Sequence, residues 1–405
     1  MIENLIERFY EAASMNRWND HIRPVELTEL DKQAHKMVIA YVIAKFEESD
    51  REIEIDWQKL IEGGIFEFLH RTILTDIKPP VFHKMMEEKE DDLNFYVLEK
   101  LDGDLIGLDK NFKENFEKYL FDHKYAQIEK RILKAAHYIA TNWEFKIIYH
   151  TSPFIYGIEE TKEAIAKQIE DHYDLIGVQK LKLEKKSYGF IDLCGQLRFQ
   201  ERWAHSPRIP KTSVLGHMFI VAIISYILTL ENNPCPKRLY NNFFTGLFHD
   251  LPEILTKDII SPIKTSVEGL EDIIKDYEED QMKTRLFPLL PVSWRNEIRY
   301  FTQDEFENKV KIKDKIIKGV SFGEINSKYN YNEFSPLDGK LIKVCDKLTA
   351  FVEADLSIKH GITSKHLEEG RKNIYEDFKN KKVSGIDFGR LFKYFKNSSF
   401  EISDF

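Results

Sequence analysis

The stretch Leu247-Phe248-His249-Asp250-Leu251-Pro252-Glu253 is the part of this sequence from which the fold and the chemistry follow. It places a histidine and an aspartate side by side at the end of an apolar run, an environment that suits a bound divalent cation. His217 lies upstream on a strongly apolar segment, and Asp346 lies downstream in a second apolar segment. The sequence therefore offers two imidazoles and two carboxylates in the order H…HD…D.

The segments around these residues have the periodicity of buried helices. Apolar residues recur three and four positions apart, as on one face of an α-helix, at Phe219, Ala222, Ile223, Tyr226 and Ile227 and again at Leu341, Val344, Cys345, Leu348 and Val352. Proline and glycine fall mainly between such runs, as in helices joined by turns. Alternation typical of strands is sparse, and residues 145–149 are the best short candidate. We expect an all-α fold.

The composition excludes several classes of protein. With 42% apolar and 31% charged residues the sequence is that of a globular protein, and its net charge of −9 disfavours binding to nucleic acid or to an anionic membrane. The longest apolar run, residues 218–230, is shorter than the roughly 20 residues that span a bilayer. Three widely spaced cysteines form no disulfide framework, and the N-terminus lacks the pattern of a signal peptide. We expect a cytoplasmic protein.

Each of the four ligand-type residues has a simpler explanation when it is taken alone. A histidine on an apolar helix is more often a core residue, and His249 alone is compatible with a helix C-terminal cap. Asp346, however, has the apolar Ile342 and Ala350 on its own helical face. A buried carboxylate is unfavourable unless it is paired or bound to a metal. Helical bundles bring such ligands together from separate helices, which favours a metal site.

This ligand set contains no thiolate and suits one divalent ion, which is Mn, Co, Fe, Ni, Zn or Mg. Such an ion lowers the pKa of a bound water and polarises a phosphoryl oxygen, so phosphoester hydrolysis is the expected reaction, with Asp250 and Glu253 as catalytic residues. Glu253, one turn beyond Asp250, is either a general acid or base or a helix N-terminal residue that the helix dipole favours. Arg202 is a candidate phosphate clamp, and Trp203 either stacks on a base or fills the core.

The sequence also repeats itself. The stretch Asn16-Arg17-Trp18 precedes His35 as Glu201-Arg202-Trp203 precedes His217, and residues 133–137 fall where residues 342–346 fall in the second half. We therefore predict two tandem domains, a degenerate one at 1–180 and an intact one at 181–405. A first-half site of His35, Glu67, His70 and His137 is conceivable, but loss of the chemistry is the more economical interpretation, because two carboxylates have been replaced.

These motifs resemble those of the HD-domain metal-dependent phosphohydrolases, an all-helical superfamily, and most closely its 5′-deoxynucleotidase branch. That branch has an Arg-Trp pair before the first histidine and a His-Asp-x-x-Glu-x-Leu-Thr-x-Asp run, which residues 249–258 match at every fixed position. The resemblance covers roughly residues 190–360. It implies metal binding by His217, His249, Asp250 and Asp346, catalysis by Glu253, phosphate binding by Arg202, and a nucleoside site formed by Trp203 and Asp258.

Alternatives remain open on this evidence. The preferred substrate is a nucleoside or deoxynucleoside 5′-monophosphate, and the alternatives are a dNTP, a cyclic nucleotide or an alarmone. A nucleotide-sensing protein without catalysis is the competing class of function. The resemblance is also compatible with a homodimer, or with packing of the two repeats as an internal pseudo-dimer. The charged tail from Lys365 onward is expected to add helix to the second domain.

Overall fold

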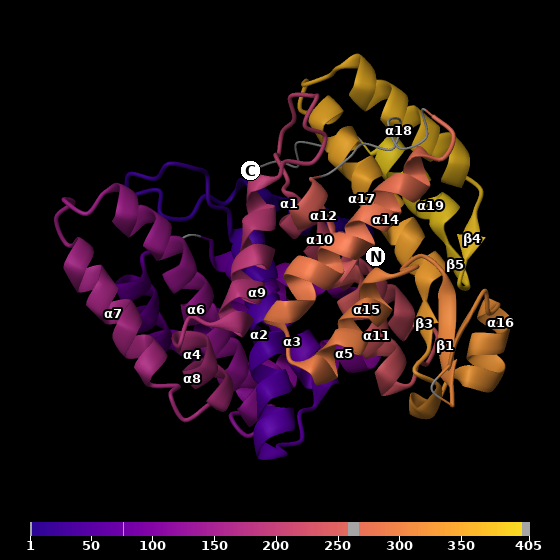
Figure 1. The fold of residues 1–405 in the computed structure, drawn as a ribbon. Coiled ribbons are helices and arrows are strands. Elements are labelled where there is room, and N and C mark those ends of the chain that lie inside the picture. Colours follow the sequence, from indigo (N-terminus) through magenta and orange to yellow (C-terminus); the bar gives the residue numbers. More distant parts are fainter. Residues whose placement is uncertain (1, 76, 258–266, 314, 399–405) are drawn as a thin grey trace. The chain divides into compact units, whose positions relative to one another are not determined.

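The computed structural model describes residues 2–75, 77–257, 267–313 and 315–398 of the chain. These residues form two compact units, 1–195 and 196–405, whereas the sequence suggested a boundary at residues 180–181. Nearly all regular structure in both units is helical, which confirms the all-α prediction (Figure 1). No helix in the described ranges has the length and apolar character that crossing a membrane requires.

The first unit is entirely helical in its described part and is built around α2, α3 and α6. Thr28 begins α2 by accepting a hydrogen bond from the backbone N–H of Asp31, and Asp56 begins α3 in the same way through Lys59. The helices of this unit are α1 (Ile2–Ser14), α2 (Glu29–Arg51), α3 (Trp57–Leu74), α4 (Pro79–Leu105), α5 (Lys110–Phe121), α6 (Gln127–Thr151), α7 (Ile158–Glu170), α8 (Ile176–Lys182) and α9 (Lys186–Gln196).

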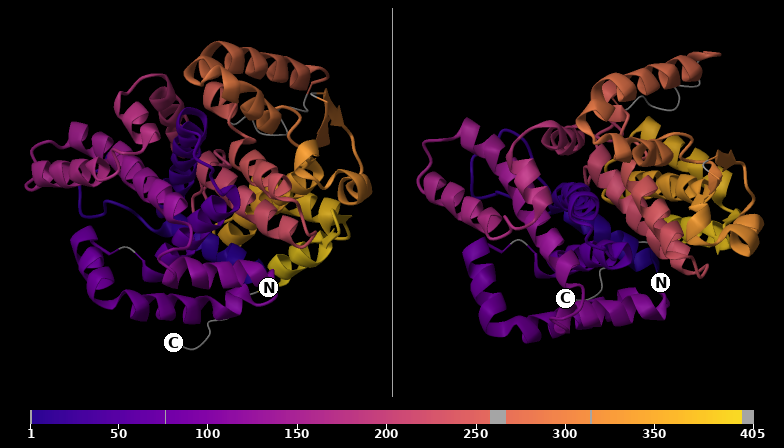
Figure 2. Two further views of the ribbon diagram at one scale, coloured as in Figure 1. Left: turned by 90° about the horizontal axis from the view of Figure 1, so that it is seen from below. Right: turned by 60° about the horizontal axis from the view of Figure 1, so that its bottom comes forward.

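One sequence prediction for this unit is wrong. Residues 145–149, the best strand candidate, lie inside α6. Phe145 and Ile148 are buried three positions apart, which is the spacing of a helical face. Helix α4 departs from regular geometry at Lys89, where it bends sharply (Figure 2).

The second unit is organised around α10, α11 and α17, which pack against one another. Ser213 caps α10 through the N–H of Gly216, and nearly every residue of α10 is buried, as expected for a helix that is apolar on all sides. The helices are α10 (Val214–Leu230), α11 (Pro236–Phe248), α12 (Glu253–Thr256), α14 (Leu270–Gln281), α15 (Val292–Thr302), α16 (Phe322–Glu324), α17 (Gly339–Lys359), α18 (Lys365–Phe378) and α19 (Phe388–Asn397).

Two contacts fix the positions of α11 and α17. Gly246 allows α11 to approach α10 closely, since a Cβ atom at this position would lie only 2.6 Å from the Cα of Ala222. The guanidinium of Arg238 on α11 forms two hydrogen bonds, of 2.6 and 2.7 Å, to the carboxylate of Asp338, which directly precedes α17. Both residues of this ion pair are fully buried. The pair therefore joins the start of α11 to the start of α17.

Short strands complete the unit. β1 (Asn308–Ile312) pairs antiparallel with both β2 (Lys315–Lys318) and β3 (Leu337–Asp338), and β4 (Lys382–Val383) pairs with β5 (Ile386–Asp387). The buried Val310 of β1 forms a small apolar cluster with Val320 and Ile325. Helices α18 and α19 pack on α17, as predicted for the tail.

Candidate metal centre

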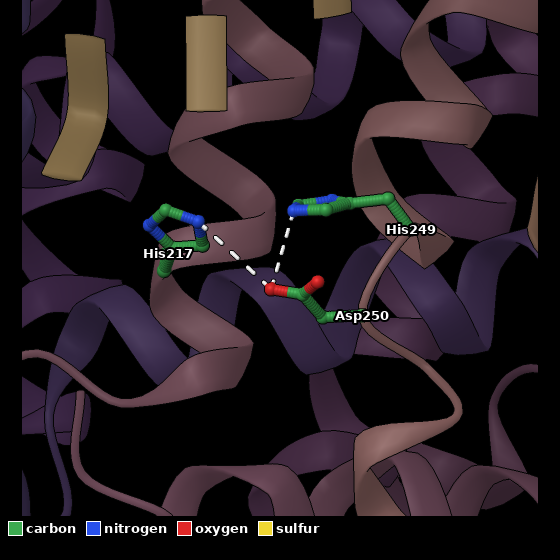
Figure 3. A group of neighbouring side chains, drawn as sticks. All are labelled: His217, His249 and Asp250. Carbon is green, nitrogen blue, oxygen red and sulfur yellow. Dashed lines mark ion pairs between the residues drawn. The ribbon is translucent and has the colours of Figure 1, made fainter. Parts of the chain in front are cut away.

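Three helical segments of the second unit bring the predicted ligands together. His217 lies in the first turns of α10, His249 directly follows α11, and Asp250 is the next residue. The ligand atoms of these three residues all lie within 4.8 Å of one another (Figure 3). Asp346 on α17 joins them, with its Oδ1 atom 3.0 Å from Nε2 of His217. Among the residues that the structure describes, His217, His249 and Asp250 are the only such group.

The geometry of this group fits one cation. The Oδ2 atom of Asp250 lies 3.2 Å from Nε2 of His249 and 4.0 Å from Nε2 of His217. An ion bound at about 2.1 Å holds neighbouring ligand atoms roughly 3–4 Å apart. Both imidazoles direct the Nε2 atom toward the carboxylate, as Figure 3 shows, so the donor atoms converge on one point.

The other ring nitrogen of each histidine also has an acceptor beside it. The Nδ1–H group of His249 donates to the carbonyl of Gly246 at 2.8 Å. The Nδ1 atom of His217 lies 3.3 Å from Oε1 of Glu353. Such contacts fix the tautomer of a metal-binding histidine and leave its Nε2 lone pair facing inward. Both imidazoles are therefore oriented as ligands.

Glu353 is a site residue that the sequence analysis did not identify. It is fully buried on α17, two turns beyond Asp346, and it also accepts hydrogen bonds from Trp203 Nε1 at 3.1 Å and Thr212 Oγ1 at 2.8 Å. Burial raises the pKa of Glu353, but the charges of Arg208 and His217 outweigh burial and lower this pKa to about 2. The seven-residue spacing from Asp346 was the available signal, because it places both carboxylates on one helical face.

The charges of the site are strongly coupled. Burial lowers the pKa of His249, but the carboxylate of Asp250 outweighs burial and raises this pKa to about 9. Asp250 is correspondingly held ionised, with a pKa well below its usual range. The ammonium of Lys347 lies 3.1 Å from Oδ2 of Asp346, and the Asp346 carboxylate raises the pKa of Lys347. The carboxylates of Asp250 and Asp346 thus stabilise the positive charges of His249 and Lys347 beside them.

Glu253, the predicted acid or base, is buried at the first position of α12. Its backbone N–H donates to the carbonyl of Asp250 at 3.0 Å, so both residues belong to the same turn. A second carboxylic acid, Glu305, lies next to Phe306, whose ring packs 6.0 Å from that of His249. Burial raises the pKa of Glu305. In the sequence Glu305 is one of several neighbouring acidic residues, with Asp304 and Glu307, so no local pattern marks it.

Arg202 faces the same group of carboxylates. Its guanidinium lies 3.7 Å from Asp250 and 3.9 Å from both Asp346 and Glu353. The ring of Trp203 lies against α18, where a Cβ atom at Gly370 would approach it to 2.6 Å. Asp258, the other predicted substrate residue, lies outside the described residues.

The ligand-type residues of the first unit lie in separate contacts. His35 is buried with its Nε2 atom 2.8 Å from the carbonyl of Ile191, and His70 contacts Asn94 at 3.1 Å. Glu67 pairs with Lys36 at 3.0 Å. Within the described part of the chain, these side chains form no group of three that could share an ion.

Comparison with known proteins agrees with this arrangement. Residues 194–375 match the HD domain family. A 108-residue segment, 25% of this chain, is 35% identical to the 4′-phosphooxetanocin A phosphatase of Priestia megaterium, of which it covers 54%. A 130-residue segment, 31% of this chain, is 26% identical to the 5′-deoxynucleotidase of Vibrio atlanticus (strain LGP32), of which it covers 65%. The chain thus spans between half and two thirds of the length of these curated relatives. The match to the HD domain family spans residues 194–375, the part of this chain that carries the two imidazoles and two carboxylates.

Proposed function

We propose that this chain is a metal-dependent phosphohydrolase that releases phosphate from a nucleoside 5′-monophosphate. The observation that carries the proposal is the convergence of His217, His249 and Asp250, with both imidazoles oriented by acceptors behind them. The names of the two similar proteins, a phosphatase and a 5′-deoxynucleotidase, support the reaction class and the kind of substrate.

The chain's own residues have complementary roles in this proposal. His217, His249, Asp250 and Asp346 hold the ion, which when bound activates water and polarises a phosphoryl oxygen. Arg202 lies within 4 Å of two of these ligands, so its guanidinium is placed to bind a phosphate seated beside them. Glu253, on the same turn as Asp250, exchanges a proton with water or the leaving group.

The proposed nucleotide substrate is supported by the residues near Arg202 and by the net charge of the chain. Trp203 precedes α10 beside Arg202, and together with Asp258 it is proposed to contact the nucleoside. The net charge of −9 disfavours a nucleic-acid substrate, which presents many phosphates to a protein surface. The guanidinium of Arg202, which lies beside Asp250 and Asp346, is suited to the single phosphate of a small nucleotide.

The test is phosphate release from a panel of nucleoside mono-, di- and triphosphates in the presence of Mn or Co. Wild type should hydrolyse a monophosphate, and Asp250→Asn and Glu253→Gln should each reduce kcat at least about a hundredfold. Arg202→Ala should act mainly on KM. Glu271→Gln, on the exposed face of α14, is the control and should leave both constants unchanged. Metal binding without turnover of any nucleotide would instead favour a sensor.

A further inference from the structure

The two units contain the same local structure before their first long buried helix. The N–H of Arg17 donates to the carbonyl ten residues later, at Leu27, and the N–H of Arg202 donates to the carbonyl ten residues later, at Thr212. Trp18 and Trp203 both have positive φ values, 55° and 58°. These matches place residues 17–28 of the first unit in register with 202–213 of the second.

The following helices continue the match. Thr28 and Ser213 cap α2 and α10, and each accepts from the N–H three residues ahead. A Cβ atom at Gly64 of α3 would collide with Met37 of α2, as one at Gly246 of α11 would collide with Ala222 of α10. Gly64 faces the side chain of Met37 and Gly246 faces the backbone of Ala222, and Met37 and Ala222 occupy the same position in the register of α2 and α10.

The last helices of the two units agree as well. Trp18 Nε1 donates to Glu144 of α6 at 3.0 Å, and Trp203 Nε1 donates to Glu353 of α17 at 3.1 Å. Glu144 lies seven residues beyond His137, and Glu353 lies seven residues beyond the predicted ligand Asp346. The register of all three helix pairs is therefore set by contacts within each unit.

This register identifies the first-unit residues at the four ligand positions. Lys32, Glu67, Phe68 and His137 correspond to His217, His249, Asp250 and Asp346, respectively. The sequence alone suggested His35 as the partner of His217, but His35 lies three residues further along α2 and contacts the carbonyl of Ile191 instead. The counterpart of the contact between His217 and Asp346 is a hydrogen bond between the amine of Lys32 and Nδ1 of His137.

The chemistry at these positions opposes a divalent ion. Lys32 is completely buried, and Arg17, Lys36 and Arg71 all contribute positive charge near His137. Glu67 places a carboxylate at a ligand position, but this carboxylate is already paired with Lys36. Phe68, at the position of Asp250, stacks on Phe9 with ring centroids 5.7 Å apart.

We propose that the first unit is a second HD domain in which the side chain of Lys32 takes the place of both a metal ligand and the ion. The chain consequently binds one catalytic ion, in the second unit, and the first unit keeps the fold without the chemistry. This proposal relies on the proposed function only for the metal site of the second unit.

The first test is the metal content of the intact chain after loading with Co and removal of excess ion. Wild type should hold one ion per chain, and His249→Ala should hold none. An ion that anomalous diffraction locates in the first unit, in wild type or in His249→Ala, would overturn the proposal. A wild type that binds one ion but hydrolyses no nucleotide would contradict the proposed function and leave this inference standing.

A gain-of-binding variant tests the role of Lys32 directly. The triple substitution Lys32→His, Phe68→Asp and His137→Asp restores the ligand types of the second unit beside Glu67. A folded triple variant, identified by its circular dichroism, should bind two Co ions, and anomalous diffraction should locate the second near residue 32. A folded triple variant that still binds one ion would contradict the claim that Lys32 holds the ion's place.

Discussion

Oε1 of Glu353 lies 3.3 Å from Nδ1 of His217, while Nε2 of the same imidazole lies 3.0 Å from Oδ1 of Asp346. The ring is thus held between two carboxylates of one helix, α17, which are seven residues apart. Contacts behind a metal-binding histidine typically change metal affinity by 10- to 100-fold. This relationship makes Glu353 a positioning residue of the site.

We predict that Glu353→Gln weakens the binding of Mn or Co about tenfold, because an amide holds the Nδ1–H of His217 less strongly than a carboxylate does. Titration calorimetry measures the change. The matched control is Glu144→Gln in the first unit, where the glutamate accepts hydrogen bonds from Arg17 and Trp18. Equal weakening by both substitutions would show that Glu353 acts only through the stability of the fold.

The acid stability of the protein should depend on the same residue. The pKa of Glu353 is about 2 in the folded chain and near 4.5 ordinarily, so its contribution to stability is present above pH 4.5 and is lost as the pH falls toward 2. A shift of this size corresponds to roughly 3 kcal/mol. Urea unfolding at pH 6 and pH 3 should therefore show a smaller pH dependence for Glu353→Gln than for wild type. Identical pH dependence would contradict this assignment.

Metal binding should release a proton from His249. The pKa of this imidazole is raised to about 9, so it is protonated at pH 7 and must lose its proton to become a ligand. Its contribution to the stability of the metal-free chain is present below pH 6.5 and is lost as the pH rises through 9. The apparent affinity for metal should thus increase up to about tenfold per pH unit below pH 9.

Calorimetry in two buffers of different ionisation enthalpy measures this proton. Close to one proton should be released per ion at pH 7 and less at pH 9.5. His366→Ala, which removes an exposed imidazole on α18, is the control and should leave the release unchanged. Release of no proton at pH 7 would mean that His249 is already neutral.

Gly246 should be required for the alignment of α10 and α11. In Gly246→Ala the new methyl group meets the Cα of Ala222 at 2.6 Å, so the helices must separate and the protein should lose about 1–3 kcal/mol of stability. Metal affinity should fall as well, since Gly246 supplies the carbonyl that holds His249. Gly323→Ala is the matched control, because a Cβ atom there meets nothing within 4 Å. Equal melting temperatures for the two variants would contradict the close approach.

The sequence was sufficient where one local pattern determines one structure. The three- and four-residue spacing in α10 and α17 correctly predicted buried helices. The prediction was wrong at residues 145–149, where a short alternation suggested a strand although the flanking sequence continues the helical period of α6. The alternation Lys309-Val310-Lys311-Ile312, which is that of strand β1, passed unnoticed because lysine dominates it.

Features that depend on tertiary contacts could be predicted only in part. The spacing places Glu353 on the helical face of Asp346, but its contacts with the imidazole of His217 and the indole of Trp203 depend on the tertiary structure. The correspondence of Lys32 with His217 likewise requires the backbone register, because a chemical comparison of residues favours the nearby His35. Packing of the repeats as a pseudo-dimer, or formation of a homodimer, stays a prediction.

The separation of the ligands along the chain has a consequence for biosynthesis. His217 and Asp346 are 129 residues apart, so α17 leaves the ribosome well after α10. Domains fold in the order in which they are translated. A nascent chain can therefore complete its first unit long before the second has a full set of ligands, so the complete metal site forms only after α17 has been synthesised.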